Sequence, residues 1–507
     1  MSNTITALLD LDKAIAVFRD TIESAMALGE ISQWNGKQLR EREQQIRQAA
    51  LVLAGQCIAL LLTQLSQLPT AQKEASKRTE GLRRPESQGG GKQTVRILTM
   101  GNVEVTLRLP YVLGAPAKAR KRKRKVGQRG RASLGGFYPF LSWLGLPERV
   151  TPLVWSTVAQ QGMLSTSFAA ARNNLKDWGI KLSDGRIQRL TYCFGGQGKA
   201  VSQRQLDQLQ RKKLGSGKTL KEKRVVISVD GGRTRLRRRK RGKVLTSGRH
   251  GYHGKWREPK LLTIYAVDEQ GRQLNTLEIP ITNDGTFAKV ETFMDLLEMH
   301  LVRLGIVEAQ QVLLLADGAD WIWQRLPQLL KKLQVPSERV FELIDFYHAA
   351  EHLQTFAEAA CTSKKKAKTW YKQSRSKLKQ GQIESLLTQM QTMATQAKTK
   401  RKRSQSQKAL NYFCKQPQRF DYQRVQRMNL PIGSGAIESL IRQVVNLRLK
   451  STGKFWLEEH AEVILLGRCQ WAAGAWEQFC SDILTANLTP ISANKLIHFQ
   501  RDEFAAA

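Results

Sequence analysis

The 507-residue chain is short of cysteine and of acidic residues. Its six cysteines are scattered without a C-x-x-C pair, which argues against a disulfide framework and a zinc ribbon and fits a reducing cytoplasm. Asp and Glu number 43 against 82 Lys and Arg, so the formal net charge is +39. This excess indicates a polyanionic partner, most simply nucleic acid, with an acidic membrane surface as the alternative.

Long apolar runs are also missing. The most apolar window, residues 49–65, is shorter than the roughly 20 residues of a bilayer span and contains Gln56 and Gln64, so we expect a buried helix and no membrane partner. The first 20 residues lack a basic start and a continuous apolar stretch, so no signal peptide is expected. The 41% hydrophobic and 25% charged residues exclude a wholly disordered or collagen-like chain. Together these features favour a cytoplasmic, nucleoid-associated protein.

The positive charge is concentrated in three strips that contain no acid. Residues 118–131 hold 9 basic residues in 14, residues 233–243 hold 8 in 11, and residues 364–379 hold 8 in 16. Solvated loops, or a localisation signal in the first strip, are the alternatives to contact with DNA phosphates. We favour DNA contact, and expect the first strip to be an extended arm. Its candidate DNA-binding residues are Arg120, Lys121, Arg122, Lys123 and Arg124.

Helical, linker and hairpin patterns follow one another in the N-terminal third. Residues 1–80 have the apolar spacing of helices, and residues 81–92, with three consecutive glycines, read as a linker. Residues 95–112 alternate apolar and polar around Gly101-Asn102, which predicts a β-hairpin within a region, residues 93–131, that also includes the basic arm.

Residues 132–200 are expected to form a DNA-binding region of helix-turn-helix type. A helix over residues 167–177, a glycine-containing turn and a helix capped by Ser183 give this outline. Arg186 and Arg189 on the second helix are the candidate contacts in a major groove. Two ordinary core helices are the alternative.

Three apolar runs each end at an aspartate. Residues 225–229, 312–316 and 340–344 have the composition of buried strands, and they precede Asp230, Asp317 and Asp345. Open α/β sheets bind ligands beyond the carboxyl ends of their strands, so acids at these positions can meet. Residues 261–267 and 273–281 predict two more strands and residues 287–304 a helix, in the order β-β-β-α-β-α-β.

Four phrases carry a resemblance to a known family: VDGGR, LLADGADWIW, LIDFYHAAEH and LPIGSGAIESLIRQVVNLRLKSTGKFW. Over about residues 223–479 the chain resembles the DDE transposases of bacterial insertion sequences, in particular the Kra-type and related group akin to the Mutator-like transposases. The resemblance implies an α/β RNase H-like catalytic core, a mixed sheet flanked by helices. The expected division is a first core part at residues 223–350, an all-α insertion at 351–430, a second core part at 431–485 and a tail at 486–507.

The resemblance further implies that Asp230, Asp317 and Glu438 are catalytic and bind two Mg²⁺ ions, with Mn²⁺ able to substitute. The residue types suit this chemistry, because Mg²⁺ prefers oxygen ligands and a two-metal site promotes phosphoryl transfer. Glu438 should lie in the first turn of a helix opened by Gly433-Ser434-Gly435. Asp320 competes with Asp317, which directly follows its strand and is preferred.

Asp345 and His348 match a family motif beside the active site, so we interpret them as supports of the site, with simple packing as the alternative. His348 also begins an H-x-x-E-H pattern that is typical of one class of zinc peptidase. A peptidase has no need of three basic strips, and no third zinc ligand is evident, so this interpretation is not favoured.

Two further sets of residues are candidate DNA contacts. One follows the first aspartate and the other follows Glu438, and basic side chains there can position phosphates while an aromatic ring can stack on an unpaired base. Trp456 fits a core position equally well. The candidates are Arg233, Arg235, Arg237, Arg238, Arg442, Arg448, Lys450 and Trp456.

The sequence therefore predicts a transposase that binds terminal inverted repeats in double-stranded DNA. It would cut at the element ends and join the 3′-hydroxyl ends to target DNA, acting as a homodimer or higher oligomer. Two alternatives remain open. One is a sequence-specific DNA-binding protein of transposase descent without catalysis, and the other is an RNase H-like structure-selective nuclease.

Overall fold

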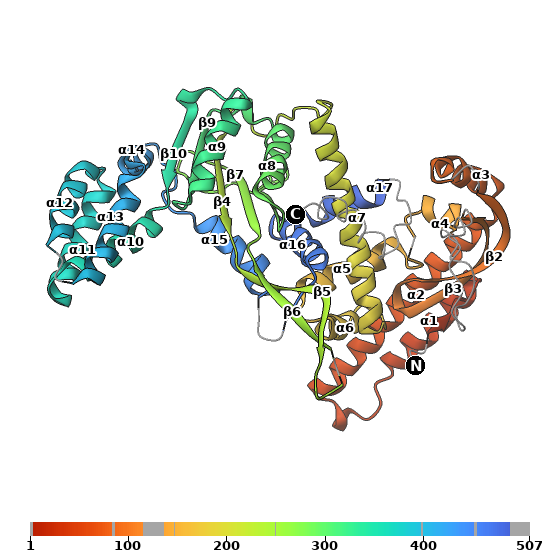
Figure 1. Cartoon of the computed structure of the whole chain (residues 1–507). Helices are drawn as coiled ribbons and strands as arrows, with labels where there is room; N and C mark the ends of the chain where they lie inside the picture. The colour runs from red at the N-terminus through yellow and green to blue at the C-terminus, as the bar shows by residue number, and fades with distance from the viewer. Residues whose placement is uncertain are drawn as a thin grey trace. The chain divides into compact units, whose positions relative to one another are not determined.

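The computed structural model describes residues 4–83, 87–114, 136–146, 148–248, 250–396, 399–450 and 454–486. The first basic strip, with Arg120 to Arg124, and the tail beyond residue 486 lie outside the described residues. The chain is mixed α/β with many helices, which confirms the fold class at that level (Figure 1). It divides into two compact units, one drawn from residues 1–201 and 477–507 and the other from residues 202–476.

The first unit contains a β-hairpin. Its strands are β2 (Gln88–Leu98) and β3 (Val103–Leu113), and the short β1 (Ile5–Thr6) pairs parallel to β3. Gly101 and Asn102 at the turn have φ of 63° and 62°, a left-handed conformation that Gly and Asn adopt more readily than other residues. The hairpin prediction is confirmed.

The predicted linker over residues 81–92 is wrong from Gln88 onward. β3 extends as far as Leu113, whose partner in the antiparallel ladder is Gln88, so the glycine-rich segment is taken up into β2. The ladder is irregular at these glycines, with a register shift between Gly89 and Lys92. A long partner strand has overridden the local preference for a flexible connection.

Three helices accompany the hairpin: α1 (Leu11–Met26), α2 (Gly36–Gln67) and α3 (Pro69–Arg78). The expected buried helix over residues 49–65 belongs to α2, but α2 is only partly buried. Its buried residues are Ala49, Gly55, Gln56, Ala59 and Leu62, and Ile58 and Leu61 are exposed. One face packs near the hairpin, where the Thr99 hydroxyl donates to the Gly55 carbonyl at 3.0 Å. By length and composition alone, α2 is also long and apolar enough to cross a membrane.

The remaining helices of the first unit include the predicted pair. They are α4 (Pro139–Trp143), α5 (Pro152–Leu164), α6 (Phe168–Lys176), the first part of α7 (Asp184–Gln210), and most of α17 (Trp476–Thr485). Ser167 caps α6, and Gly179 in the connecting turn has φ of 64°. Helix, turn and helix are therefore confirmed as secondary structure. The middle of α7, residues 190–198, is buried throughout, as expected for a core helix.

A five-stranded mixed sheet forms the second unit. Its order is β10-β9-β4-β7-β8, with β4 parallel to β9, β9 parallel to β10, and β7 antiparallel to both β4 and β8. The strands are β4 (Arg224–Gly231), β7 (Lys260–Val267), β8 (Thr282–Thr286), β9 (Gln311–Ala316) and β10 (Val340–Ile344). Four of them were predicted, because continuous apolar runs are typical of strands covered on both faces.

The predicted strand at residues 273–281 is wrong. These residues are irregular, apart from an isolated bridge between Gln273 and Val267, and the strand begins only at Thr282. Leu277 is fully exposed, so the apolar residues that suggested a strand do not face the core. Pro280 also lacks the N–H that a ladder requires.

Helices flank the sheet: α8 (Val290–Leu304), α9 (Asp320–Lys332), α15 (Gly435–Ile441) and α16 (Glu458–Ala472). α15 contacts β4 and β7, and α16 contacts β8. Between β10 and α15 the chain forms a separate group of helices: α10 (Phe346–Ala360), α11 (Lys364–Lys379), α12 (Ile383–Thr395), α13 (Lys400–Cys414) and α14 (Tyr422–Arg427) (Figure 1). This all-helical segment was expected from residue 351 and begins at Phe346.

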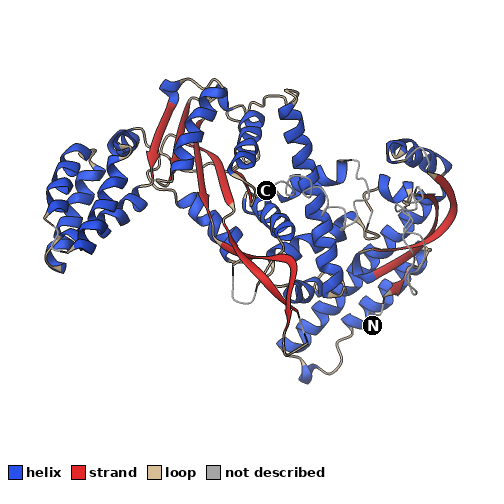
Figure 2. Cartoon of the chain, viewed as in Figure 1, coloured by secondary structure: helices blue, strands red, loops and turns tan. Residues whose placement is uncertain are grey.

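The second basic strip is a strand and not a loop. β5 (Thr234–Val244) pairs antiparallel with β6 (His250–Arg257), and the two-stranded ribbon is inserted between β4 and β7 (Figure 2). Thr234 and Leu236 are buried while Arg235 and Arg237 are exposed, so β5 alternates as a strand with one covered face does.

Candidate functional site

Three carboxylates lie at the carboxyl ends of neighbouring strands of the five-stranded sheet. In the parallel ladders, the residue before Asp230 is opposite the residue before Asp317, which is opposite the residue before Asp345. Asp230, near the end of β4, and Asp317 and Asp345, which directly follow β9 and β10, therefore lie at the same level on neighbouring strands. The continuous apolar runs fix the strands in this register, and the acids come at the ends of these runs, where Asp230 and Asp317 are partly buried and Asp345 is fully buried.

Asp230 is partly buried, and burial raises its pKa to about 6. That value is the net result of several effects: the negative charges of Asp317 and Glu258 also raise the pKa, whereas the Gly231 N–H, which donates to Asp230 Oδ1 at 2.6 Å, and the charge of His348 lower it. A carboxyl group in these surroundings gains from a nearby cation. Glu258, at the end of the ribbon, carried no signal in the sequence that would have singled it out.

Asp317 and Asp320 differ in their surroundings. Asp317 Oδ1 accepts the Ala319 N–H at 3.0 Å, and the Asp317 charge acts on Asp230. Asp320 is exposed at the start of α9 and pairs with Lys415 at 2.6 Å. Asp320 is thus already neutralised by a surface lysine, so the contrast favours Asp317 as the member of the site.

Asp345 is completely buried and joins two segments of the chain. Its Oδ1 accepts the His348 N–H at 2.7 Å at the start of α10, and its Oδ2 accepts the Ser434 N–H in the loop before α15. The Ser434 hydroxyl in turn donates to Glu438 at 3.3 Å. Asp345 thereby fixes the loop that leads into α15, the helix that carries Glu438. In the sequence, the Gly-Ser-Gly segment gives no signal of this role of Ser434.

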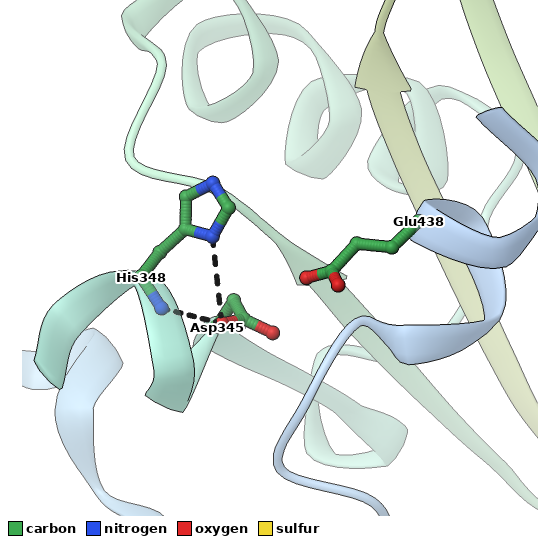
Figure 3. A group of neighbouring side chains, drawn as sticks. All are labelled: Asp345, His348 and Glu438. Atoms are coloured by element: carbon green, nitrogen blue, oxygen red, sulfur yellow. Dashed lines mark hydrogen bonds and ion pairs between the residues drawn. The ribbon is translucent and has the colours of Figure 1, made fainter. Parts of the chain in front are cut away.

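Glu438 lies in the first turn of α15, as predicted, and is exposed. Its carboxylate approaches Asp345 and His348 from the opposite side (Figure 3). Asp345, His348 and Glu438 each offer a ligand atom, and these atoms lie within 4.8 Å of one another, so the group could hold a metal ion. Two carboxylates and one imidazole suit several divalent metals, and the donor set does not select one.

The described side chains thus separate into two subsets. Asp230 and Asp317 interact across neighbouring strands, and Glu438 lies with Asp345 and His348. Asp230 and Asp317 do not belong to the group within 4.8 Å. The predicted trio is therefore divided between the two subsets: Asp230 and Asp317 in one, and Glu438 with the two supporting residues in the other.

The H-x-x-E-H pattern does not assemble as a zinc site among the described residues. His352 stacks on Tyr412, with ring centroids 3.7 Å apart and an interplanar angle of 17°, and is not part of the group that contains His348. Burial, more than any neighbouring charge, lowers the pKa of His352. The pattern places the two histidines on one face of α10, where they have different partners.

The ribbon follows β4, the strand of Asp230, directly in the chain, and its basic face is exposed. The Arg233 guanidinium lies 4.9 Å from the ring centre of Trp256, and that of Arg235 lies 5.4 Å from the ring centre of Phe455. Stacking of this kind holds a guanidinium in place without neutralising it. The exposed candidates on this segment are Arg233, Arg235, Arg237 and Arg238.

The second set of DNA-binding candidates is only partly accessible. Arg442 and Lys450 are exposed, but Arg448 is 2% exposed and Trp456 is 8% exposed. The Arg448 guanidinium lies 4.9 Å from the centre of the Trp456 ring, and the Trp456 carbonyl accepts the Arg237 N–H at 2.9 Å. The assignment of Arg448 and Trp456 as DNA contacts is therefore wrong, because the two side chains pack together beneath the ribbon.

Arg186 and Arg189 pair with an acid inside the first unit. Glu148, which is 7% exposed, lies 3.5 Å from Arg186 and 3.0 Å from Arg189, and the Glu148 carbonyl also accepts a bond from Arg186. Burial lowers the pKa of Arg186. These arginines thus have a structural role that the sequence analysis did not foresee, although Arg189 stays more than half exposed.

Comparisons of the chain with protein families, with curated proteins and with solved structures found no match in any of the three.

Proposed function

We propose that the chain is a DDE transposase with an RNase H-like core. The observation that carries this proposal is the pair Asp230 and Asp317 at the ends of adjacent parallel strands, beside a helix that bears Glu438 and contacts the same central strand. In chain order the sheet has three antiparallel strands followed by two parallel ones, with the first strand in the middle. This topology is what the family resemblance leads us to expect.

The acidic edge fits a site for divalent cations. Burial of Asp230 beside a second negative charge disfavours its ionised form, and a bound cation reverses that penalty. Asp230, Asp317 and Glu438 would hold two Mg²⁺ ions, or Mn²⁺ in their place. Metal ions bound there would supply the activation of a water or 3′-hydroxyl and the stabilisation of the leaving oxygen that phosphoryl transfer needs.

The chain's own groups then have distinct roles. Asp345 holds the Ser434 loop and so positions Glu438, and His348 lies within reach of the same carboxylate. The exposed arginines of β5 bind phosphates of the strand that leads to the acids. Because each neutralised phosphate releases counterions, binding through about 6–10 phosphates weakens by about 10³–10⁵ between 50 and 200 mM salt.

Pairing of two element ends requires at least a homodimer, acting on terminal inverted repeats and on target DNA in the cytoplasm. The exposed start of α7, with Gln188 and Arg189, is the proposed reader of the ends. Both Arg186 and Arg189 pair with Glu148, and Arg186 contributes less because its side chain is less exposed than that of Arg189.

The proposal is tested by incubating the full chain with Mg²⁺ and a labelled duplex that carries the sequence flanking its own gene. We expect cleaved and joined products that disappear with Asp230→Asn. Salt-sensitive binding without either product, in Mn²⁺ as well, would favour a DNA-binding protein without catalysis. Cleavage without joining, and without preference for the ends, would favour a structure-selective nuclease.

A further inference from the structure

A cavity of about 1100 Å³ lies between α10 and α11 in the helical segment. Pockets that enclose small molecules measure about 300–1,000 Å³, so this one can take one or two nucleotides but not a duplex. Its lining joins apolar residues such as Ala357 and Ala367 to a strongly basic rim. The basic lining residues are Lys364, Lys368, Lys372, Arg375, Lys379 and Lys402.

One wall of the pocket adjoins the candidate metal group. Phe346 and Tyr347, which line the pocket, are the two residues between Asp345 and His348 in the chain. The Phe346 N–H donates at 3.0 Å to the carbonyl of Ile432, another lining residue, two positions before Ser434. The pocket and the carboxylates therefore share the same two chain segments.

Aromatic rings supply surfaces on which a base can stack. Tyr347 is 57% exposed, an unusual position for a large ring, and Tyr371 on α11 also lines the pocket. Phe346 is buried, with the Arg375 guanidinium 5.3 Å from its ring centre. Rings of this kind accept any base, because every base has a π-face.

The basic residues of α11 that line the pocket recur at intervals of three or four, which places them on one face of the helix. The lining contains a single acid, Glu358, which accepts a bond from Gln354. The pocket is therefore net positive and complements a phosphate, while its aromatic and apolar parts complement a base.

We propose that this pocket binds an unpaired nucleotide of the DNA strand next to the cleaved bond. The base lies against Tyr347 and Tyr371, and its phosphates contact the lysines of α11 and Arg375. The inference rests on the proposed function, because it takes the nearby carboxylates to be where the strand is cut. A base that is already unpaired costs least to place in such a pocket.

The test uses the full chain in EDTA, so that cleavage plays no part. Two duplexes are compared, one with a single unpaired 2-aminopurine and one fully paired. We expect the unpaired duplex to bind at least about 10-fold more tightly, with quenched fluorescence from stacking on tyrosine. Tyr371→Ala should lose both the preference and the quenching, and Tyr371→Phe should keep them.

The contribution of the pocket's lysines to phosphate binding is tested in the same assay. Lys368→Gln with Lys372→Gln should weaken binding of the unpaired duplex by about 10-fold or more. The matched control is Lys365→Gln with Lys366→Gln, exposed residues of the same helix that are not among the described lining of the pocket. Equal effects of the two double variants would overturn the assignment of the phosphate contacts to this pocket.

The outcomes separate the pocket from the catalytic proposal. A protein that cleaves its DNA in Mg²⁺ but shows no preference for the unpaired duplex would overturn the pocket alone. A protein that never cleaves but keeps a tyrosine-dependent preference would leave the pocket standing and overturn the catalytic proposal. Equal competition by a short acidic peptide would overturn the nucleotide as occupant.

Discussion

Two acids, the buried Glu148 of the first unit and the partly buried Asp230 of the second, differ in whether a basic side chain compensates their charge. Glu148 in the first unit holds Arg186 and Arg189 at 3.5 and 3.0 Å. Asp230 in the second unit has no ion pair among the described residues, and burial with a neighbouring acid raises its pKa to about 6. A compensated charge stabilises the fold, whereas an uncompensated one costs free energy and is typical of a functional site.

The arginines show the same difference. In the basic strip that includes β5, the arginines are exposed, and two of their guanidinium groups lie over aromatic rings. On α7 they are directed to a carboxylate. Positive charge in the sequence is therefore stronger evidence of a DNA partner where no acid of the protein has already paired with it.

The largest effect is expected when an uncompensated acid is neutralised. Asp317→Asn and Glu438→Gln should each reduce strand cleavage by about 10³-fold or more, since a carboxylate needed for the metals is lost while the fold is retained. Binding to element ends should stay within a few fold. The measurement is single-turnover cleavage of labelled end DNA, with binding measured in parallel.

Asp320→Asn is the matched control, because Asp320 is three residues from Asp317 but pairs with Lys415 at 2.6 Å. We expect its cleavage rate to stay within about threefold of wild type, as an exposed pair contributes little. A loss with Asp320→Asn equal to that with Asp317→Asn would remove the distinction between compensated and uncompensated acids.

The next effect concerns the compensated acid. Glu148→Gln should lower the free energy of unfolding by about 2 kcal/mol, less than the roughly 3–5 kcal/mol of a fully buried pair because both arginines are partly exposed. Chemical denaturation measures this. Asp177→Asn, which removes the exposed partner of Arg47, should change stability by less than about 0.5 kcal/mol. Unchanged stability in Glu148→Gln would mean that Glu148 does not hold α7.

A smaller effect is expected on the ribbon. Arg237→Gln with Arg238→Gln should reduce the slope of log affinity against log salt by about 2 and leave the melting temperature unchanged, because two exposed phosphate contacts are lost. The control double variant, Arg272→Gln with Arg325→Gln, removes the same charge from arginines that already pair with acids of the protein. A common change of slope in both variants would reduce the ribbon's role to net charge.

The sequence predicted the elements whose signal is local. The strands before Asp230, Asp317 and Asp345 were found because each is a continuous apolar run, and the turn of Glu438 because a Gly-Ser-Gly segment opens its helix. The ribbon was missed because the arginines of β5 conceal the alternation of Thr234 and Leu236, whose burial depends on the packing of distant residues.

Partners that are distant in the chain could not be predicted. Arg448 was predicted to contact DNA because the sequence does not show that its guanidinium packs on the ring of Trp456. The fold alone brings these two side chains together. Glu148 lies 38 residues from Arg186, with no spacing rule to connect them. The pairing of Ser434 with Asp345 joins two segments 89 residues apart. Each depends on tertiary packing, which single-residue types do not encode.

The smallest effect tests the electrostatic cost at Asp230 directly. Its folded pKa of about 6 exceeds the model-compound value of 3.8, so the folded protein binds more protons than the unfolded chain between these values. Stability therefore falls as the pH rises through this window and stays lower above it. Without metal, Asp230→Asn should raise the melting temperature at pH 7.5 by about 2 °C, allowing for partial solvent screening, and the gain should vanish below about pH 4. Mg²⁺ should stabilise the wild type and not the variant, and Asp320→Asn should show neither change. A melting temperature for Asp230→Asn that follows the wild type at every pH would show that the charge at the end of β4 is compensated, as it is at Glu148.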